Sequence, residues 1–188
     1  MKHPSLIIGL TGPNASGKGT VAEILNELGF AYHSLSDQVR KEALARGLTT
    51  SREDLIRVGN LLRETDGPGA LAKRVLSELG RRDTVDSIRN PGEVQTLRDG
   101  LSNFILLGVS AEPEVRYQRA RRRARAGDSI GSFEEFRQKE ALENSSDPKA
   151  QQLKATLQCS DRMIDNNGSL EALRKRVVGL VQELERGG

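Results

Sequence analysis

The sequence is poor in cysteine and lacks long apolar runs, and each shortage excludes a class of protein. The only cysteine among its 188 residues, Cys159, rules out an internal disulfide framework and is typical of a protein in a reducing compartment. No apolar run approaches the ~20 residues that a membrane-spanning helix needs, so we expect no membrane segment. Residues 1–12 lack the long apolar region and the cleavage site of a signal peptide. We therefore expect one cytoplasmic domain over residues 1–188.

Aromatic residues and excess charge are also scarce. Aromatic side chains make up 3% of the chain, tryptophan is absent, and the net charge is +3 with a pI near 9.2. With so few rings, the chain has little surface on which the bases of a nucleic acid would stack, and we do not expect a nucleic-acid partner. A small polyanionic ligand explains the mild excess of positive charge better.

Short apolar runs alternate with longer segments whose apolar residues recur at helical spacing. The runs predict strands at 6–10, 31–34, 84–86, 103–109 and 162–164. The longer segments predict helices near 18–29, 37–47, 52–65, 69–79, 92–99, 112–125, 133–143 and 169–185. Strands separated by helices need crossover connections, so we expect an α/β fold with helices on both faces of a parallel five-stranded sheet. Ser51 with Asp54, and Ser132 with Glu135, have the spacing of helix-start capping boxes.

A glycine-bracketed loop follows the first predicted strand. Residues 12–18, GPNASGK, fit the pattern G-x-x-x-x-G-K and lead into the first predicted helix. Glycines let backbone N–H groups turn inward around a phosphate, while the lysine and the helix N-terminus add positive charge. The pattern predicts a P-loop NTPase-type fold and ATP binding by Gly12, Asn14, Ala15, Ser16, Gly17, Lys18, Gly19 and Thr20. A hydroxyl normally follows the lysine to bind Mg²⁺. Here Gly19 intervenes, and Thr20 becomes the candidate ligand.

Two stretches resemble the adenylate kinase family of nucleoside monophosphate kinases. The GKGT ending of the loop has that family's threonine after a second glycine. HSLSDQVRKEA at 33–43 is similar to its Ser-Thr-Gly-Asp-x-Leu-Arg segment, with Ser36 in place of the glycine. The resemblance implies that Asp37 lies near Mg²⁺ and the reacting phosphates, and that Arg40 grips the phosphate of the acceptor. An ordinary charged helix start is the alternative interpretation.

A third stretch, TVDSIRNPGEVQ at 84–95, is similar to the Asp-Gly-Phe-Pro-Arg segment of the same family. It departs from that segment because a serine replaces the glycine and the arginine comes one residue early. The resemblance implies that Asp86 holds Mg²⁺-bound water and that Arg89 contacts the acceptor's phosphate. By the same resemblance Glu93 or Gln95 would bind the acceptor's base. A turn with solvated charges is the alternative.

A fourth stretch, SDRMIDNNGSLEAL at 160–173, resembles the C-terminal strand-turn-helix of dephospho-coenzyme A kinases. The opening IIGLTG is also similar to theirs. The resemblance implies that Asn166, Asn167 and Gly168 line the adenine pocket of ATP. A tight Asn-Gly turn before a capped helix accounts for the same residues without a ligand.

An arginine-rich run, EVRYQRARRRARAGD, occupies residues 114–128. Phosphoryl transfer spreads negative charge over the moving group, and a lid that carries arginines can close over that charge and exclude water. We expect such a lid at about 116–148. The family resemblance implies that one or two lid arginines reach the phosphates, and we choose Arg119 and Arg123 because helices present i and i+4 together. A helical acceptor-binding flap is expected at about 36–80. A solvated basic face, or a surface that binds nucleic-acid phosphates, is the alternative for the run.

Taken together, the chain looks most like the adenylate-kinase-related nucleotide kinases of archaea and some bacteria, over nearly its whole length. This resemblance implies Mg²⁺-dependent transfer of the γ-phosphoryl group of ATP to a small phosphorylated acceptor, a nucleoside monophosphate. A dephospho-coenzyme A kinase that phosphorylates a ribose 3′-hydroxyl stays open, and there Asp37 would be the general base. A regulatory ATP-binding switch is a third possibility, but it would not need the two acceptor-side arginines.

Overall fold

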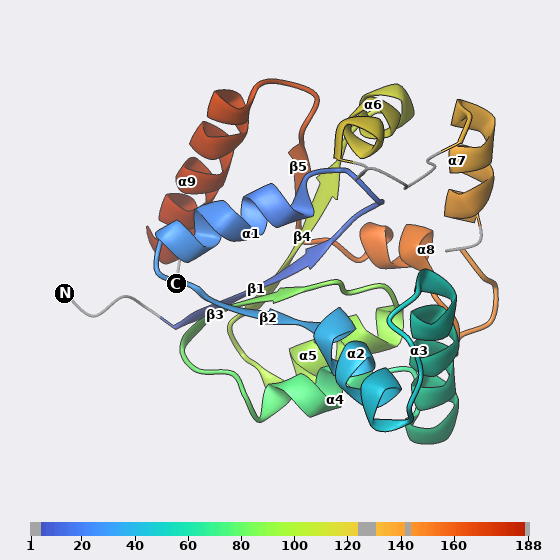
Figure 1. Cartoon of the computed structure of the whole chain (residues 1–188). Coiled ribbons are helices and arrows are strands. Elements are labelled where there is room, and N and C mark those ends of the chain that lie inside the picture. The colour runs from blue at the N-terminus through green and yellow to red at the C-terminus, as the bar shows by residue number, and fades with distance from the viewer. Residues whose placement is uncertain (1–4, 124–130, 142–143, 187–188) are drawn as a thin grey trace.

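A computed structural model describes residues 5–123, 131–141 and 144–186 (Figure 1). The strands within these ranges are β1 (Leu6–Thr11), β2 (Ala31–Ser34), β3 (Arg82–Asp86), β4 (Phe104–Ser110) and β5 (Arg162–Asp165). They form one sheet in the order β2-β3-β1-β4-β5, and each neighbouring pair is parallel. The predicted α/β fold with a parallel five-stranded sheet is confirmed.

Helices connect the strands. The described residues contain α1 (Lys18–Glu27), α2 (Leu35–Ala45), α3 (Arg52–Asp66), α4 (Ala70–Leu76), α5 (Pro91–Gly100), α6 (Pro113–Arg123), α7 (Phe133–Ala141), α8 (Leu153–Gln158) and α9 (Leu170–Arg186). Every predicted helix has a counterpart, although the predicted lid includes 124–130 and 142–143, which lie outside the described residues. The sequence did not predict α8, because six residues are too short to show a helical period. None of the described helices has the length and apolar character to cross a bilayer.

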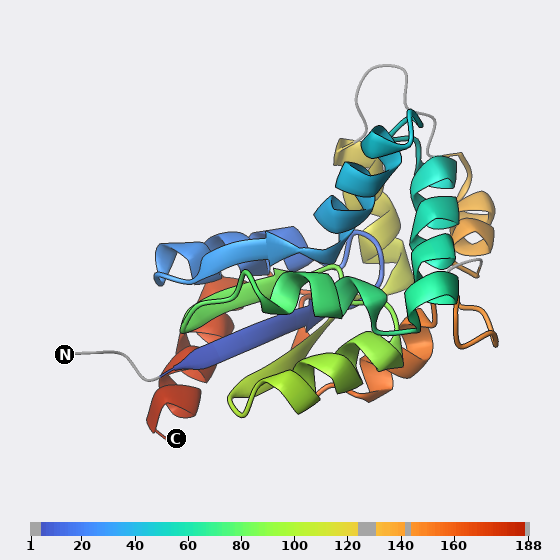
Figure 2. The same cartoon turned by 90° about the horizontal axis from the view of Figure 1, so that it is seen from below.

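The side chains of β1 alternate between two core clusters on opposite faces of the sheet. Ile7 packs with buried residues of α2, α3, α4 and α5, whereas Ile8 and Leu10 pack with those of α1 and α9. Figures 1 and 2 show the corresponding layers, with α1 and α9 on one side of the sheet and α4 and α5 on the other. All three β1 side chains are fully buried, and burial of such a side chain contributes about 1.5–3 kcal/mol. Strand β1 is thereby fixed at the centre of the sheet.

The carboxyl ends of the parallel strands meet at one edge of the sheet. Thr11 of β1 is in register with Gly108 of β4, and Ser34 of β2 is in register with Asp86 of β3. Because β3 and β4 flank β1 and their connections leave in opposite directions, a crevice is expected above the end of β1. The segments that follow these strands are the ones that carry the predicted site residues.

Helix capping agrees with the sequence patterns. The Ser51 hydroxyl accepts a hydrogen bond from the backbone N–H of Asp54 at 3.2 Å. Ser132 and Glu135 make both halves of a capping box, since each side chain accepts from the other residue's backbone N–H. Both predicted helix starts are confirmed.

Candidate functional site

The glycine-bracketed loop joins β1 to α1 and adopts backbone conformations that require glycine at both ends. Gly12 has φ of 142°, and a Cβ there would lie 2.1 Å from the carbonyl oxygen of Val109. Gly17 has φ of 104°, and a Cβ there would lie 2.1 Å from Nδ2 of Asn166. Between them Ala15 has φ of 58°, which is rare for a residue with a side chain. The loop is therefore tightly wound, and its two glycines are needed for steric reasons.

Polar contacts hold the loop in this curled conformation. Lys18 Nζ donates to the carbonyl oxygens of Gly12 at 2.7 Å and Pro13 at 3.0 Å. Asn166, 150 residues further along the sequence, donates from Nδ2 to the carbonyl oxygen of Ser16 at 2.8 Å. The Ser16 hydroxyl is completely buried and has no hydrogen-bond partner among the described residues. A buried donor without a partner at the base of such a loop fits an anionic ligand.

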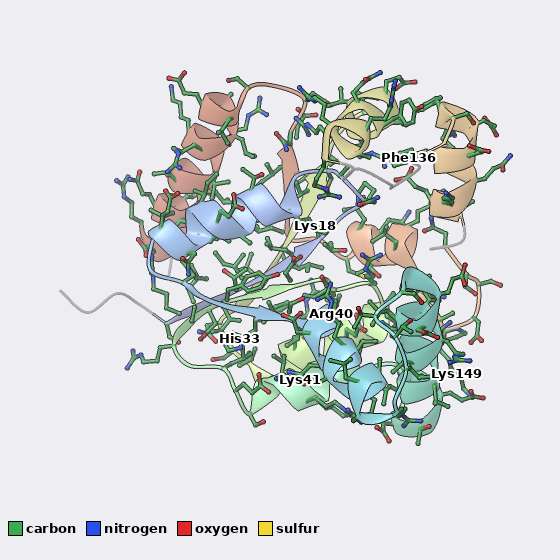
Figure 3. All side chains as sticks on the ribbon, viewed as in Figure 1. Lys18, His33, Arg40, Lys41, Phe136 and Lys149 are labelled. Atoms are coloured by element: carbon green, nitrogen blue, oxygen red, sulfur yellow. The ribbon has the colours of Figure 1, made fainter. Side chains whose placement is uncertain are left out.

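A cavity of about 900 Å³ opens above the loop. Four parts of the chain contribute its walls: the loop and the start of α1, the end of β3, the exposed face of α6, and the turn between β5 and α9 with the start of α9. Its lining residues are Asn14, Ala15, Gly17, Lys18, Gly19, Thr20, Glu23, Asp86, Arg119, Arg122, Arg123, Asn166, Gly168, Ser169, Leu170 and Leu173. We call it the nucleotide cavity. Figure 3 shows Lys18 at the start of α1 beneath α6.

The predicted Mg²⁺ ligands are only partly brought together. Thr20 and Asp86 line the nucleotide cavity, whereas Asp37 does not. The described residues contain no cluster of three or more His, Cys, Asp or Glu side chains that would hold a metal ion by themselves. Mg²⁺ prefers oxygen ligands and keeps several waters, so one hydroxyl and one carboxylate beside a phosphate loop fit this ion.

The carboxylate of Asp86 is held in place from two sides. It is 8% exposed and accepts a hydrogen bond from the backbone N–H of Ser87 at 2.6 Å. Its second oxygen accepts from Tyr32 Oη at 3.1 Å. Burial raises the pKa of Tyr32 to about 12, with a further contribution from the charge of Asp86, so the phenol keeps its proton. Tyr32 was not among the predicted site residues, because an aromatic side chain on a short edge strand carries no motif.

Asp37 lies in the first turn of α2, and its carboxylate forms an ion pair with Arg40 one turn later. Both side chains are about half exposed. The two residues predicted from HSLSDQVRKEA are therefore neighbours. Their contact favours a role for Asp37 in holding Arg40 rather than in direct metal binding.

The arginine-rich run divides between structure and cavity. Arg119 and Arg123 line the nucleotide cavity as expected, and so does Arg122. Arg123 donates to Asn14 Oδ1 at 3.3 Å, and Arg119 Nη1 makes no hydrogen bond to the described residues. Burial, with the neighbouring charge of Arg122, lowers the pKa of Arg119. Arg116, in contrast, is buried between α6, α7 and the loop.

A second cavity, of about 360 Å³, lies between α2, α3 and the end of β3. Its lining residues are Asn14, Leu35, Ser36, Val39, Arg40, Thr50, Leu55, Ile56, Gly59, Arg63, Leu71, Ser87, Arg89 and Gln151. We call it the acceptor cavity. It brings together Arg40 and Arg89, the two arginines expected to bind an acceptor. Asn14 lines both cavities, so the two meet at the loop.

Several residues named from the sequence lie outside both cavities. Glu93 is completely buried, and its carboxylate is used by Arg63 and by the start of α5. Gln95 is exposed and donates to Asp99. The side chain of Asn167 is used in structural contacts. Its Oδ1 accepts a hydrogen bond from the backbone N–H of Glu112 at 2.7 Å, and its Nδ2 donates to the carboxylate of Asp165. The side chains of Glu93 and Gln95 are thus not placed to bind a base.

Comparisons with known proteins agree with this fold. A family model for the AAA domain matches residues 11–137. The UPF0200 protein of Hyperthermus butylicus is 33% identical over 97% of each chain. The UPF0200/UPF0201 protein of Archaeoglobus fulgidus is 31% identical over 96% of this chain, which spans 56% of that relative.

Solved structures show the same architecture at lower identity. Shikimate kinase from Aquifex aeolicus superposes with a TM-score of 0.61 at 15% identity, covering 97% of this chain and 100% of that one. A gluconokinase from Sinorhizobium meliloti superposes with a TM-score of 0.59 at 15% identity, covering 99% and 97%. At these identities the two kinases indicate a shared fold and nothing about a shared substrate.

Proposed function

The chain belongs to the UPF0200 family, and we propose that this P-loop kinase-like phosphotransferase transfers the γ-phosphoryl group of ATP to a nucleoside monophosphate. One observation carries the proposal: two cavities meet at Asn14, and each is lined by cations suited to a different phosphorylated ligand. The nucleotide cavity has Lys18 and the loop. The acceptor cavity has Arg40 and Arg89. A protein that only bound and hydrolysed ATP would not need the second set.

Each set has a separate role in the proposed reaction. The backbone of the loop and Lys18 hold the β- and γ-phosphates, as the wound glycine backbone and the buried Ser16 hydroxyl support. Arg119 and Arg123 add positive charge where negative charge develops during transfer. Because the phosphate of the acceptor is already ionised, no strong general base is required.

Thr20 and Asp86 would hold Mg²⁺ and its water shell in the nucleotide cavity. When bound, the ion neutralises phosphate charge. Tyr32 and the backbone N–H of Ser87 orient the Asp86 carboxylate. Arg40 and Arg89 orient the acceptor, since planar guanidinium groups bind phosphate in a bidentate manner.

An ADP-release assay with Mg²⁺ and ATP tests the proposal. The acceptor panel contains AMP, CMP, UMP, GMP, their deoxy forms and dephospho-coenzyme A. A large stimulation by one nucleoside monophosphate is the expected result. Stimulation by dephospho-coenzyme A alone would assign the ribose-hydroxyl reaction instead, and stimulation by none would overturn the proposal in favour of an ATP switch.

Two substitutions separate the donor side from the acceptor side. Lys18→Ala is expected to abolish turnover, because it removes the positive charge that neutralises the β- and γ-phosphates of ATP. Arg40→Ala is expected to raise the KM for the acceptor with little change in the KM for ATP. Equal loss of ATP affinity in both variants would contradict the assignment of the two cavities.

A further inference from the structure

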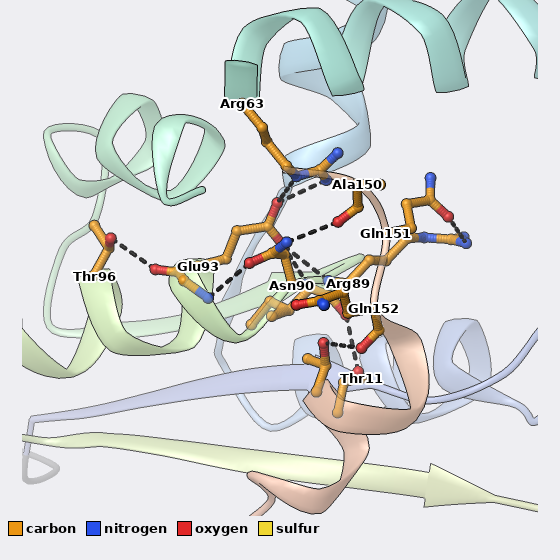
Figure 4. Close-up of polar contacts among 12 residues, drawn as sticks. Thr11, Arg63, Arg89, Asn90, Glu93, Thr96, Ala150, Gln151 and Gln152 are labelled. Atoms are coloured by element: carbon orange, nitrogen blue, oxygen red, sulfur yellow. Dashed lines mark hydrogen bonds and ion pairs between the residues drawn. The ribbon is translucent and has the colours of Figure 1, made fainter. Parts of the chain in front are cut away.

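Arg63 lies in the wall of the acceptor cavity, although no sequence motif marks it. It comes from α3 and is 3% exposed. Its Nε and Nη2 both donate to Oε1 of Glu93, at 3.0 and 2.8 Å (Figure 4). This contact fixes the guanidinium plane, because a two-point contact to one buried oxygen leaves it little freedom to rotate.

The charge of Arg63 is already balanced. Glu93 is completely buried, and its Oε2 accepts from the backbone N–H groups of Arg89 at 2.8 Å and Asn90 at 3.1 Å. The carboxylate thus has four donors and no capacity for a ligand. The Arg63–Glu93 pair is a neutral unit in the cavity wall, and a second anion placed against it would add an unbalanced buried charge.

One group of Arg63 remains unused. Its Nη1 is buried and makes no hydrogen bond within the described part of the chain. A Cβ at Gly59 would lie 3.3 Å from this nitrogen and 3.7 Å from Cγ2 of Val39, and both of these residues line the cavity. The nitrogen therefore borders the cavity at the point where α3 has no side chain. A buried donor left unpaired costs about 1–3 kcal/mol, which a ligand atom in this position would recover.

The rest of the cavity limits what that ligand atom can be. The aliphatic part of the cavity lining is formed by Leu35, Val39, Leu55, Ile56 and Leu71. Arg40 and Arg89 are the other cations in the lining and are suited to the phosphate of the acceptor. An acceptor held by them would place an apolar or planar body against these aliphatic side chains, within the cavity that Arg63 also lines.

We infer that Arg63 Nη1 donates a hydrogen bond to an uncharged carbonyl oxygen of the acceptor, an inference that rests on the proposed function. For a nucleoside monophosphate this selects a keto-bearing base. Guanine, uracil and cytosine each carry a carbonyl oxygen, whereas adenine carries none and presents an amino donor beside its ring nitrogen. The guanidinium NH₂ of Arg63 can donate to a carbonyl oxygen, but it opposes the adenine amino group as donor against donor. Arg63 is thus a specificity-determining residue, and the enzyme prefers GMP, UMP or CMP to AMP.

Gly59→Ala tests the position without removing a charge. Gly59 lies inside α3 at an ordinary helical φ, where alanine is favoured over glycine by roughly 0.5–1 kcal/mol, so the variant should fold. Its methyl group crowds Arg63 Nη1 and the oxygen bound there. We expect the KM for the preferred acceptor to rise about tenfold, with the KM for ATP unchanged. Gly179→Ala is the matched control, because Gly179 is also helical and a Cβ there meets nothing within 4 Å.

Arg63→Lys tests the hydrogen bond itself. The lysine keeps the positive charge beside Glu93 but lacks the second NH₂ group. Thermal unfolding shows whether the variant is folded, and the acceptor panel is then repeated. The ratio of kcat/KM for the preferred keto-bearing acceptor (GMP, UMP or CMP) to that for AMP is expected to fall about tenfold, which a merely structural role would not change.

The outcomes separate this inference from the proposed function. If no acceptor stimulates the wild-type enzyme, the proposed function fails. Calorimetric titration of GMP, UMP, CMP and AMP then still tests Arg63, because Gly59→Ala should weaken binding of the keto-bearing nucleotides. If an acceptor is phosphorylated but AMP is preferred, or if Gly59→Ala leaves the acceptor KM at the Gly179→Ala value, the inference about Arg63 is wrong and the phosphotransferase stands.

Discussion

Removal of the Arg116 side chain should destabilise the protein and weaken ATP binding together. Arg116 is 6% exposed, and its Nε donates to the carbonyl oxygen of Ala111 at 2.9 Å. Its Nη1 forms an ion pair with Glu140 of α7 and donates to the carbonyl oxygen of Asn14 at 3.4 Å. The guanidinium also lies 5.8 Å from the ring centroid of Phe136. One side chain thus connects α6, α7 and the phosphate loop.

The structure sets the size of the effect for Arg116→Met. Breaking a buried ion pair by removing one partner costs about 3–5 kcal/mol, because the remaining charge is left unpaired. The side chain of Glu140 is 19% exposed, so water reaches the remaining carboxylate, and methionine retains most of the apolar stem. We therefore expect a loss of about 2–3 kcal/mol in the free energy of unfolding. Glu140→Gln keeps a hydrogen-bond acceptor and should cost about 1 kcal/mol.

Urea unfolding followed by circular dichroism measures both variants and the double variant. The cycle of Arg116→Met with Glu140→Gln should give a coupling free energy of about 1–2 kcal/mol, since the two side chains touch. The KM for ATP should rise in Arg116→Met because Asn14 loses a donor to its carbonyl oxygen. A coupling near zero, or a loss below about 0.5 kcal/mol, would show that Arg116 is a surface cation and refute the reasoning.

Three further substitutions test contacts in or beside the nucleotide cavity. Tyr32→Phe should raise the Mg²⁺ concentration needed for half-maximal activity about threefold, since Asp86 loses one of its two donors. Because the folded-state pKa of Tyr32 is raised, its contribution to stability is present below pH 10 and lost as the pH rises through about 12, and alkaline titrations of wild type and Tyr32→Phe should diverge there. Asn166→Ala should cost about 1–3 kcal/mol in urea unfolding by leaving the Ser16 carbonyl oxygen unpaired, and a loss near zero would contradict that contact. Gly17→Ala should abolish ATP binding measured by calorimetry, and unchanged affinity would refute the steric argument.

The phosphate loop and the sheet could be predicted because their signals are local. The two glycines of GPNASGK occupy two of the three positive-φ positions in the loop, and the alternation in β1 matches its two buried faces. The position of Arg40 and Arg89 in one cavity came from resemblance to a family and not from periodicity. The two arginines line one cavity because α2 and the end of β3 lie next to each other in the fold. No local sequence pattern predicts that neighbourhood.

Residues whose roles depend on distant partners could not be predicted. Arg63 stands in an unremarkable helical segment, and its partner Glu93 is 30 residues away. The predicted lid began at Arg116 and contained Arg119 and Arg123 as well, but the sequence gives no information on where α7 packs. Contact with Glu140 buries the first arginine, while the other two remain beside the loop. The sequence therefore predicted the charge of this helix face but not its division into structural and ligand-facing residues.

Asn90 connects the acceptor cavity to the segment that returns from the lid. Its Nδ2 donates to the carbonyl oxygens of Pro148 and Ala150, both at 2.7 Å, while its Oδ1 caps α5 through the N–H of Gly92 (Figure 4). Gln151, which follows Ala150, lines the acceptor cavity. Its Oε1 accepts a hydrogen bond at 3.5 Å from Nη1 of Arg89, the residue before Asn90. A shift of this segment would therefore move a wall of the cavity and a contact of one acceptor arginine at once. We therefore expect the position of the predicted lid and acceptor binding to be coupled through these contacts, and the affinity for the acceptor should depend on whether ATP is bound.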